Sequence, residues 1–273
     1  MADVIVVIGS GGIGNAIARR QGFGKTVLLA DLDANTLRDA ADGMEAASYT
    51  VVTQIVDVSS RKSVRALADR AASLGPVMQL VNTAGLSPNM APPEQVLKVD
   101  LYGAAVVFEE FERVISPGGA GLIISSMAGH MMRQLPEEQE QELAHLPADE
   151  LLSLPLLKVP NSLVGYMIAK RANHLRVQSA AMSWGEKGAR VNSISPGIIV
   201  TPLAQHELNS EIGDGYRAMI AASPSKRMAP PEEIAVAAAY LLGPDASFVT
   251  GSDLLIDGGV IAAMRAGKLP VPG

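Results

Sequence analysis

Residues 4–14 read VIVVIGSGGIG, an apolar run that leads directly into a glycine-rich turn. The run Val4–Ile8 contains no polar residue, which is typical of a strand buried on both faces of a sheet. Gly9, Gly11 and Gly14 form G-x-G-x-x-G, and the apolar spacing that follows indicates a helix. A glycine turn between strand and helix can hold a pyrophosphate, because backbone N–H groups and the helix dipole attract anions. The alternative is a plain strand-to-helix turn.

Further short apolar runs recur along the chain, each closed by Gly, Asp, Asn or Ser. Segments with helical spacing lie between several of them, and this alternation predicts βαβ units. We therefore expect an α/β fold with a doubly wound parallel sheet of the Rossmann type, as a single domain over residues 1–273. The expected strands are Val4–Ile8, Val27–Ala30, Val51–Val56, Val77–Val81, Leu122–Ile124, Val191–Ile194 and Leu254–Ile256.

Composition excludes several classes of protein. Hydrophobic residues make up 48% of the 273 residues and charged residues 18%, which excludes intrinsic disorder. The net charge of −6 argues against a nucleic-acid partner or a polybasic membrane patch. The absence of cysteine excludes disulfides and thiol catalysis. No apolar stretch is long enough to span a bilayer and no signal peptide is recognisable, so we expect a cytoplasmic protein without membrane contact.

Asp31 ends the second expected strand, and Asp33 follows it. A carboxylate at this place in a dinucleotide-binding fold accepts hydrogen bonds from the ribose hydroxyls of adenosine and repels a 2′-phosphate. The nearest following cation is Arg38. The cofactor expectation is therefore NAD rather than NADP, and the alternative for Asp31 is a solvated loop acid.

Tyr166 and Lys170 stand four residues apart, so on a helix they share a face. A free phenol has a pKa near 10, and an ammonium beside it favours the phenolate and lowers that value. The pair can therefore act as a general acid and base. Ser126 ends another apolar run and would lie at the carboxyl edge of the sheet, where ligands bind in such folds. The alternative for the pair is an amphipathic surface helix.

Taken in order, these motifs resemble the short-chain dehydrogenase/reductase family from Val4 to about Gly259. Each motif is weak alone, but their order is specific to the family. The pieces are the glycine loop, Asp57-Val58, Asn82-Thr83-Ala84-Gly85, Ser126, Tyr166 with Lys170, Pro196-Gly197 with Thr201, and Gly251 with Asp257-Gly258-Gly259.

The resemblance implies hydride transfer between a nicotinamide cofactor and a secondary alcohol or ketone. Tyr166 would be the acid and base, Lys170 would lower its pKa and hold the nicotinamide ribose, and Ser126 would hydrogen-bond the substrate oxygen. Thr201 would orient the carboxamide. The remaining residues expected at the cofactor are Gly9, Gly11, Gly12, Ile13, Gly14, Asp31, Asp57, Val58, Asn82, Ala84, Gly85, Pro196 and Gly197.

The chain departs from the family pattern at three places. The glycine loop is one residue shorter and lacks the usual threonine. Asp100 stands where the family often has an asparagine in a proton relay to the lysine, and an ionised carboxylate cannot donate as an amide does. Ser126 and Tyr166 are 40 positions apart, much farther than is usual, because an acidic and then Leu-rich insertion occupies residues 130–163. The insertion is either a substrate lid or a surface helix with a solvated acidic face.

Other functions find less support in the sequence. His130, His145, His174 and His206 show no paired spacing, so we expect surface histidines and no metal. The sequence contains no G-x-S-x-G elbow, so it does not indicate a serine hydrolase. A non-catalytic NAD-binding sensor or scaffold is the main alternative function. The substrate is expected to be a small apolar alcohol or ketone, and the resemblance implies a homo-oligomer, a tetramer or dimer, through segments 99–115 and 166–184.

Overall fold

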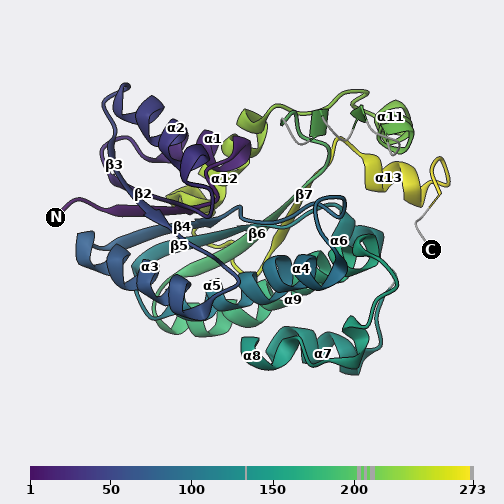
Figure 1. Cartoon of the computed structure of the whole chain (residues 1–273), viewed down its shortest axis with the longest axis horizontal. Helices are drawn as coiled ribbons and strands as arrows, with labels where there is room; N and C mark the ends of the chain where they lie inside the picture. Colours follow the sequence, from purple (N-terminus) through teal and green to yellow (C-terminus); the bar gives the residue numbers. More distant parts are fainter. Residues whose placement is uncertain (133, 202–203, 206–207, 210–212, 271–273) are drawn as a thin grey trace.

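The computed structural model describes residues 1–132, 134–201, 204–205, 208–209 and 213–270. Seven parallel strands form one sheet in the order β3-β2-β1-β4-β5-β6-β7, which is a doubly wound single domain, as predicted (Figure 1). All seven expected strands are present. Their bounds are β1 Val4–Ile8, β2 Thr26–Asp31, β3 Thr50–Ile55, β4 Val77–Asn82, β5 Ile115–Ile124, β6 Arg190–Pro196 and β7 Asp253–Ile256.

Helices cover both faces of the sheet. In Figure 1, α1, α2 and α12 lie above it and α3, α5 and α9 lie below it. The helices and helical turns are α1 Gly12–Gln21, α2 Ala34–Glu45, α3 Arg61–Leu74, α4 Pro93–Val96, the π-helical η1 Leu97–Gly103, α5 Ala104–Glu112, α6 Ala128–Met131, α7 Glu137–His145, α8 Ala148–Leu151, η2 Pro155–Leu157, α9 Ser162–Glu186, α11 Gly213–Ala222, α12 Pro231–Leu242, η3 Pro244–Ala246 and α13 Val260–Arg265.

The central position of β1 in the sheet explains why its sequence is apolar throughout. Val4, Val6 and Ile8 pack into the core on the side of α3, α5 and α9, whereas Ile5 and Val7 pack into the core on the side of α1 and α12. Successive side chains of a strand point to opposite faces, so a central strand covered on both sides needs an apolar residue at every position. All five side chains are fully buried.

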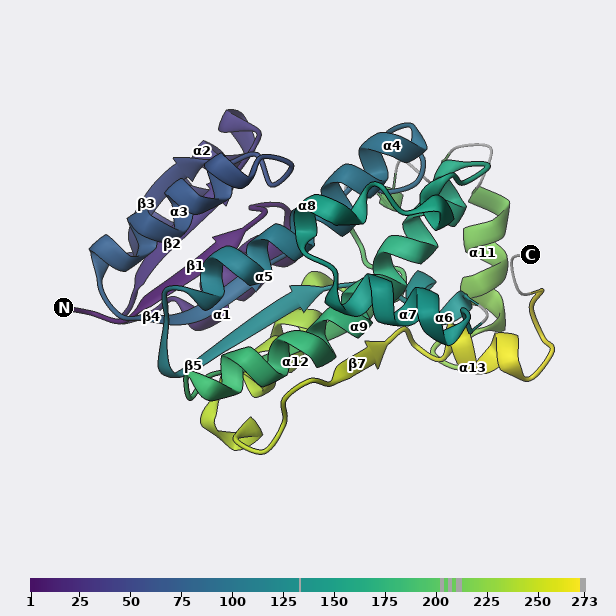
Figure 2. The same ribbon diagram turned by 90° about the horizontal axis from the view of Figure 1, so that it is seen from below.

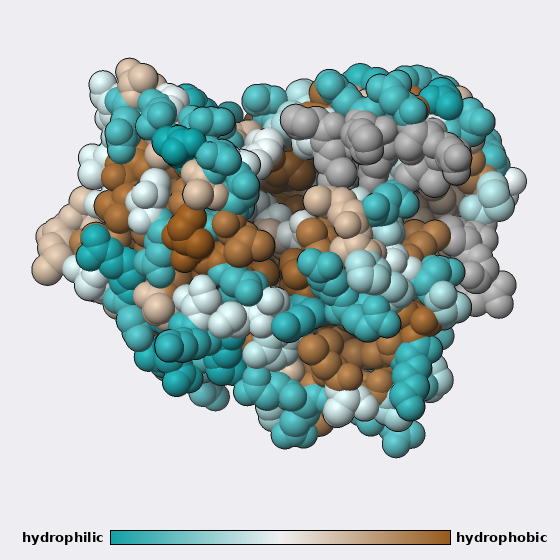
Figure 3. Space-filling view, in the orientation of Figure 1, coloured by the Kyte–Doolittle hydropathy of each residue, from teal (hydrophilic) through white to brown (hydrophobic). Residues whose placement is uncertain are grey.

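The carboxyl ends of the strands share one edge of the sheet, because every pairing is parallel. Figure 2 shows α6, α11 and α13 beyond this edge, on the side to which the arrows of β5 and β7 point. On the face seen in Figure 3, hydrophilic residues cover most of the surface, and hydrophobic residues show in the recesses, including a hollow in the middle of the face. Within the described part of the chain, no helix is both long and apolar enough to cross a bilayer.

The insertion is packed into the fold rather than standing away from it. Its α7 and α8 lie below α9 in Figure 1, and its buried leucines, including Leu143 and Leu151, belong to the same core as α5 and α9. The buried guanidinium of Arg176 on α9 donates to the backbone oxygen of Leu143 at 3.1 Å. Glu137 and Glu138 at the start of α7 are exposed. The helices α7 and α8 therefore cover part of α5 and α9 within one subunit.

Candidate active site

The glycine loop between β1 and α1 has the shape expected for a phosphate site. Gly9 has φ +91°, and a Cβ placed there would lie 2.4 Å from Oγ1 of Thr83. A Cβ at Gly14 would lie 1.8 Å from the backbone oxygen of Gly9. Only glycine fits at either position. At Gly11, the N-cap of α1, no described atom lies within 4 Å of such a Cβ, and no side chain caps the helix. The first N–H groups of α1 are therefore accessible to an anion.

Asp31 lies at the carboxyl end of β2, directly beside this loop. One of its carboxylate oxygens, Oδ2, accepts hydrogen bonds from the backbone N of Ser10 at 2.6 Å and from its Oγ at 2.9 Å. The loop is one residue shorter than the family pattern, and Ser10 ties it to the acid. Asp33 serves a different purpose. It caps α2 by accepting from the backbone N of Thr36 at 2.7 Å, and this hydrogen bond lowers the pKa of Asp33.

Asp57 follows β3 and Asn82 ends β4, both at the same edge of the sheet. The carboxylate of Asp57 accepts from the backbone N of Ser59 at 2.8 Å, so its loop is held in a tight turn. The buried amide of Asn82 accepts from the backbone N of Ala84 at 3.2 Å. Val58, next to Asp57, is buried against η1. These residues line the edge of the sheet beyond β3 and β4, where the adenosine half of a dinucleotide lies in this fold.

Tyr166 and Lys170 lie one turn apart on α9, as their spacing predicted. The Nζ of Lys170 is 5.2 Å from the centre of the Tyr166 ring. The same Nζ is 2.8 Å from Oδ1 of Asp100, which comes from η1. Both Lys170 and Asp100 are buried, whereas Tyr166 is half-buried. The structure therefore joins three of the four residues expected to be catalytic in one cluster.

The ionisation of the buried pair is set by two opposing effects. Burial would lower the pKa of Lys170, but the charges of Asp100 and Tyr166 outweigh burial, and the pKa lies above the ordinary lysine value. Burial raises the pKa of Asp100 and outweighs the attraction of Lys170. Asp100 also accepts from the backbone N of Leu86 at 3.0 Å. A Cβ at Gly85 would lie 2.6 Å from Oδ1 of Asp100, so a side chain at this position would displace the pair.

Ser126 and its neighbour Ser125 follow β5 but have different surroundings. Ser126 is half-buried, and its Oγ accepts from the backbone N of Ala128 at 3.1 Å at the start of α6. Ser125 is buried; its Oγ donates to the backbone oxygen of Lys170 at 3.0 Å and also lies 3.0 Å from Nε2 of His174. Ser126 is therefore the serine with access to a ligand, and Ser125 supports the helix that carries Lys170.

The carboxyl end of β6 lies close to the glycine loop. A Cβ at Gly12 would lie 3.2 Å from Cγ2 of Thr201, so Thr201 faces the start of α1. Gly197, after Pro196, packs against Asp257, since a Cβ there would lie 2.6 Å from the Asp257 Cα. Ile13, on the first turn of α1, packs against the core. Within the described residues, the expected cofactor positions therefore share one edge of the sheet.

Tyr166 packs against a methionine-rich apolar cluster. Its members come from α6, α9, α11 and α13 and the adjoining loops, and include Met127, Met131, Met167, Met219, Met228 and Met264. A cavity of about 140 Å³ adjoins this cluster at the carboxyl ends of β6 and β7, and Ile198, Ile220 and Val260 belong to both. The sequence shows that methionine is frequent, but not that these side chains gather at one place.

One of the histidines does not lie as expected. His174 is buried, so the expectation of surface histidines is wrong for this residue. The available signal was its spacing, because His174 lies four residues after Lys170 and therefore on the same face of α9. Burial lowers the pKa of His174 to about 4, which keeps the imidazole neutral at neutral pH. His130 is partly exposed and His145 is exposed, while His206 lies outside the described residues.

Comparison with known proteins identifies the family. Residues 3–135 match the family described as short chain dehydrogenase, and residues 156–261 match the family described as enoyl-(acyl carrier protein) reductase. The short-chain dehydrogenase/reductase bsc3 of Alternaria brassicicola is 42% identical over 95% of this chain and 96% of its own length. The 3-alpha-hydroxysteroid dehydrogenase/carbonyl reductase of Comamonas testosteroni is 30% identical over 82% of this chain and 87% of its own.

A solved structure has the same fold. A single-residue variant of actinorhodin polyketide ketoreductase with NADPH superposes with a TM-score of 0.74, at 24% identity over 95% of this chain and 97% of that one. The family matches and the relatives support an oxidoreductase that acts on CH–OH groups with a nicotinamide cofactor. The chain belongs to the short-chain dehydrogenase/reductase family, as its motifs predicted.

Proposed function

We propose that this protein transfers a hydride between NAD and a small apolar secondary alcohol or its ketone, with Tyr166 as the acid and base. The observation that carries the proposal is the position of the Lys170 ammonium, which is 5.2 Å from the Tyr166 ring and lies beside Gly85, after β4 at the carboxyl edge of the sheet. A cation at this distance favours the phenolate. Nicotinamide, when bound, supplies the hydride acceptor for oxidation and the donor for reduction.

The side chains have separate roles in this proposal. In oxidation, Tyr166 Oη takes the hydroxyl proton while the carbon–hydrogen bond breaks and the carbonyl forms; in reduction it returns the proton. Ser126 Oγ donates to the substrate oxygen. Lys170 stabilises the phenolate and Asp100 holds Lys170 by their ion pair. An ionised Asp100 accepts hydrogen bonds but cannot donate one, so it anchors the lysine ammonium and does not supply the N–H donor that an amide would.

The cofactor would lie along the carboxyl edge of the sheet. The pyrophosphate fits at Gly11, where backbone N–H groups of α1 are accessible. Gly9, Gly12, Ile13 and Gly14 form the rest of this loop. NAD is preferred over NADP because the Asp31 carboxylate beside the loop would repel a 2′-phosphate. Arg38 does not offset this charge, since its guanidinium is exposed and donates to Asn35.

The methionine-rich cluster supports an apolar substrate. Methionine side chains are flexible and polarizable, so they fit irregular apolar ligands. Met127 and Met131 approach from the side of Ser126, and Met264 approaches from α13, so a ligand at Tyr166 would meet apolar walls. Residues 130–163 lead into this wall, and we propose that their first part, up to Met132, limits substrate access. We also propose a homo-oligomer, with α5 and α9 only partly available because α7 and α8 cover them.

The proposal is tested by assaying the purified protein with NAD and NADP on a panel of apolar and polar secondary alcohols and on their ketones. We expect turnover that Tyr166→Phe reduces by at least about 100-fold, since general acid–base catalysis contributes about 10²–10⁴-fold. Calorimetric titration with NAD should show unchanged cofactor affinity in this variant. Tight NAD binding with no turnover of any alcohol or ketone would instead indicate a sensor or scaffold.

A further inference from the structure

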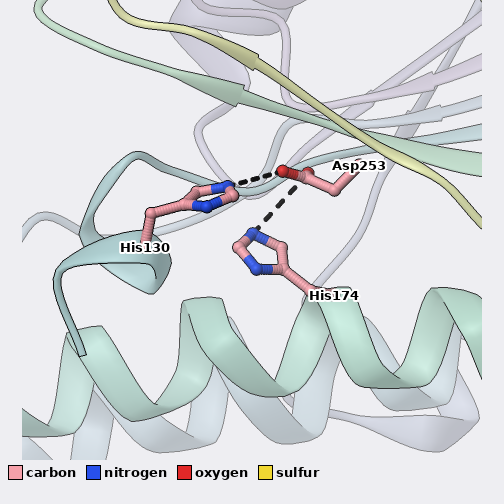
Figure 4. A group of neighbouring side chains, drawn as sticks. All are labelled: His130, His174 and Asp253. Carbon is pink, nitrogen blue, oxygen red and sulfur yellow. Dashed lines mark hydrogen bonds and ion pairs between the residues drawn. The ribbon is translucent and has the colours of Figure 1, made fainter. Parts of the chain in front are cut away.

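Two histidines and an aspartate from three separate elements meet next to Ser125, whose Oγ is hydrogen-bonded to the backbone of Lys170. His130 comes from α6, His174 from α9 and Asp253 from the start of β7. Figure 4 shows both imidazole rings pointing toward the carboxylate. The Nε2 of His130 is 2.7 Å from Oδ2 of Asp253, and the Nε2 of His174 is 3.6 Å from its Oδ1.

These atoms lie close enough together to bind one cation after small side-chain movements. One donor atom from each residue lies within 4.8 Å of the other two. Tetrahedral ligands about 2.1 Å from zinc stand about 3.4 Å from one another, so small side-chain rotations would place all three at bonding distance. We propose that His130, His174 and Asp253 bind a divalent transition-metal cation of the zinc class.

The surroundings of Asp253 support this assignment. Its side chain is 11% exposed, and its Oδ1 accepts from Oγ of Ser193 at 2.6 Å and from Oγ of Ser195 at 2.9 Å. Carboxylates that bind metals are usually held by such second hydrogen bonds, which fix their orientation. Two imidazoles and one carboxylate are also residue types that bind zinc in proteins.

The ligand set also selects the kind of metal. Imidazole nitrogen suits zinc, copper, iron and nickel, whereas magnesium and calcium prefer oxygen ligands. His174 is buried, but the His130 side chain is 22% exposed, so one side of the cluster is open to water. Water would complete the coordination there.

A cation at this site would join elements that carry the proposed active site. It would tie α6, which follows Ser126, and α9, which carries Tyr166 and Lys170, to the edge strand β7. The Nε2 of His174 also lies 3.0 Å from Oγ of Ser125, which donates to the backbone oxygen of Lys170. We therefore expect the protein to unfold at a higher temperature in the presence of zinc than in the presence of magnesium.

Equilibrium dialysis of the full, untagged, chelator-treated chain against zinc, followed by metal analysis, tests the proposal. We expect the wild-type protein to bind one zinc ion per chain. In the same experiment with magnesium in place of zinc, we expect no bound metal. His130→Gln and Asp253→Asn should each weaken zinc binding by at least about 100-fold, because loss even of a supporting hydrogen bond costs about 10–100-fold. His145→Gln is the matched control, since it removes an exposed histidine of α7, and should bind zinc as wild type does.

Two further measurements separate a built site from surface binding. Ser193→Ala should weaken zinc binding by about 10-fold, since its hydroxyl orients the carboxylate. Cobalt in place of zinc should give the intense visible bands of a four- or five-coordinate ion in wild type and lose them in His130→Gln. His130 is partly exposed, so this variant should fold. Zinc binding that survives in His130→Gln and Asp253→Asn, or no stoichiometric zinc in wild type, would overturn the proposal.

Discussion

Replacing Asp100 by Asn removes a buried negative charge from the Tyr166–Lys170 pair and leaves the shape of the side chain almost unchanged. Oδ1 of Asp100 is 2.8 Å from Lys170 Nζ, which is 5.2 Å from the Tyr166 ring centre. The carboxylate is therefore at most about 8 Å from the ring centre and about 11 Å from the phenol oxygen. At an effective dielectric constant of about 20, these distances correspond to about 1.5–2 kcal/mol of repulsion.

This repulsion converts into a shift of about 1–1.5 pH units, since one unit is about 1.4 kcal/mol. The sign is the same whichever group of the pair loses the proton, because removing a negative charge makes either deprotonation easier. We therefore expect the acid limb of kcat/KM for alcohol oxidation to move down by about 1–1.5 units in Asp100→Asn. The apparent pKa belongs to the coupled pair.

The pH profile is measured with saturating cofactor, beside Asp69→Asn, which removes the same charge from an exposed carboxylate on α3. Asp69→Asn should leave the limb in place. Near-ultraviolet absorbance of tyrosinate, taken as the difference from Tyr166→Phe, follows the same ionisation without turnover. An acid limb that stays in place or moves up in folded Asp100→Asn, with NAD affinity retained, would refute the reasoning.

Three other predictions concern the cofactor, the insertion and stability. Asp31→Ala should narrow the preference for NAD over NADP by at least about 10-fold in calorimetric titrations, because the repelling charge is gone; an equal or tighter NADP affinity in wild type would contradict the assignment. Deleting residues 130–161 should raise KM because the segment limits substrate access. The deletion also removes buried leucines of the core, so we expect cofactor affinity and thermal stability to fall as well. Glu110 is buried beside Arg65, and although burial would raise its pKa, hydrogen bonds from the arginines lower it to about 2 from 4.5. Its stabilisation, about 3 kcal/mol, is present above pH 4.5 and is lost as the pH falls toward 2. Urea unfolding should therefore show that the stability of Glu110→Gln depends less on pH in this range than that of wild type.

Local sequence determined most of the fold. Most of the strands are visible as apolar runs with few polar interruptions, because a central parallel strand must be apolar on both faces. The strand β5 starts at Ile115, earlier than expected, because Pro117, Gly118 and Gly119 conceal its first part. Gly9 and Gly14 were recognisable from the glycine pattern, and each meets a backbone or side-chain atom that excludes any Cβ. The Tyr166–Lys170 pair was recognisable because four residues make about one helical turn.

What only the tertiary structure decided is contact between residues far apart in the chain. The pattern placed Asp100 near Lys170 through the family resemblance, but only the packing of η1 against α9 shows a buried ion pair of 2.8 Å. His130, His174 and Asp253 carry no linear motif, yet α6, α9 and β7 bring them together. Periodicity records which side of an element is buried. It does not record which side chains of two elements face each other, since that depends on how the helices and the sheet pack.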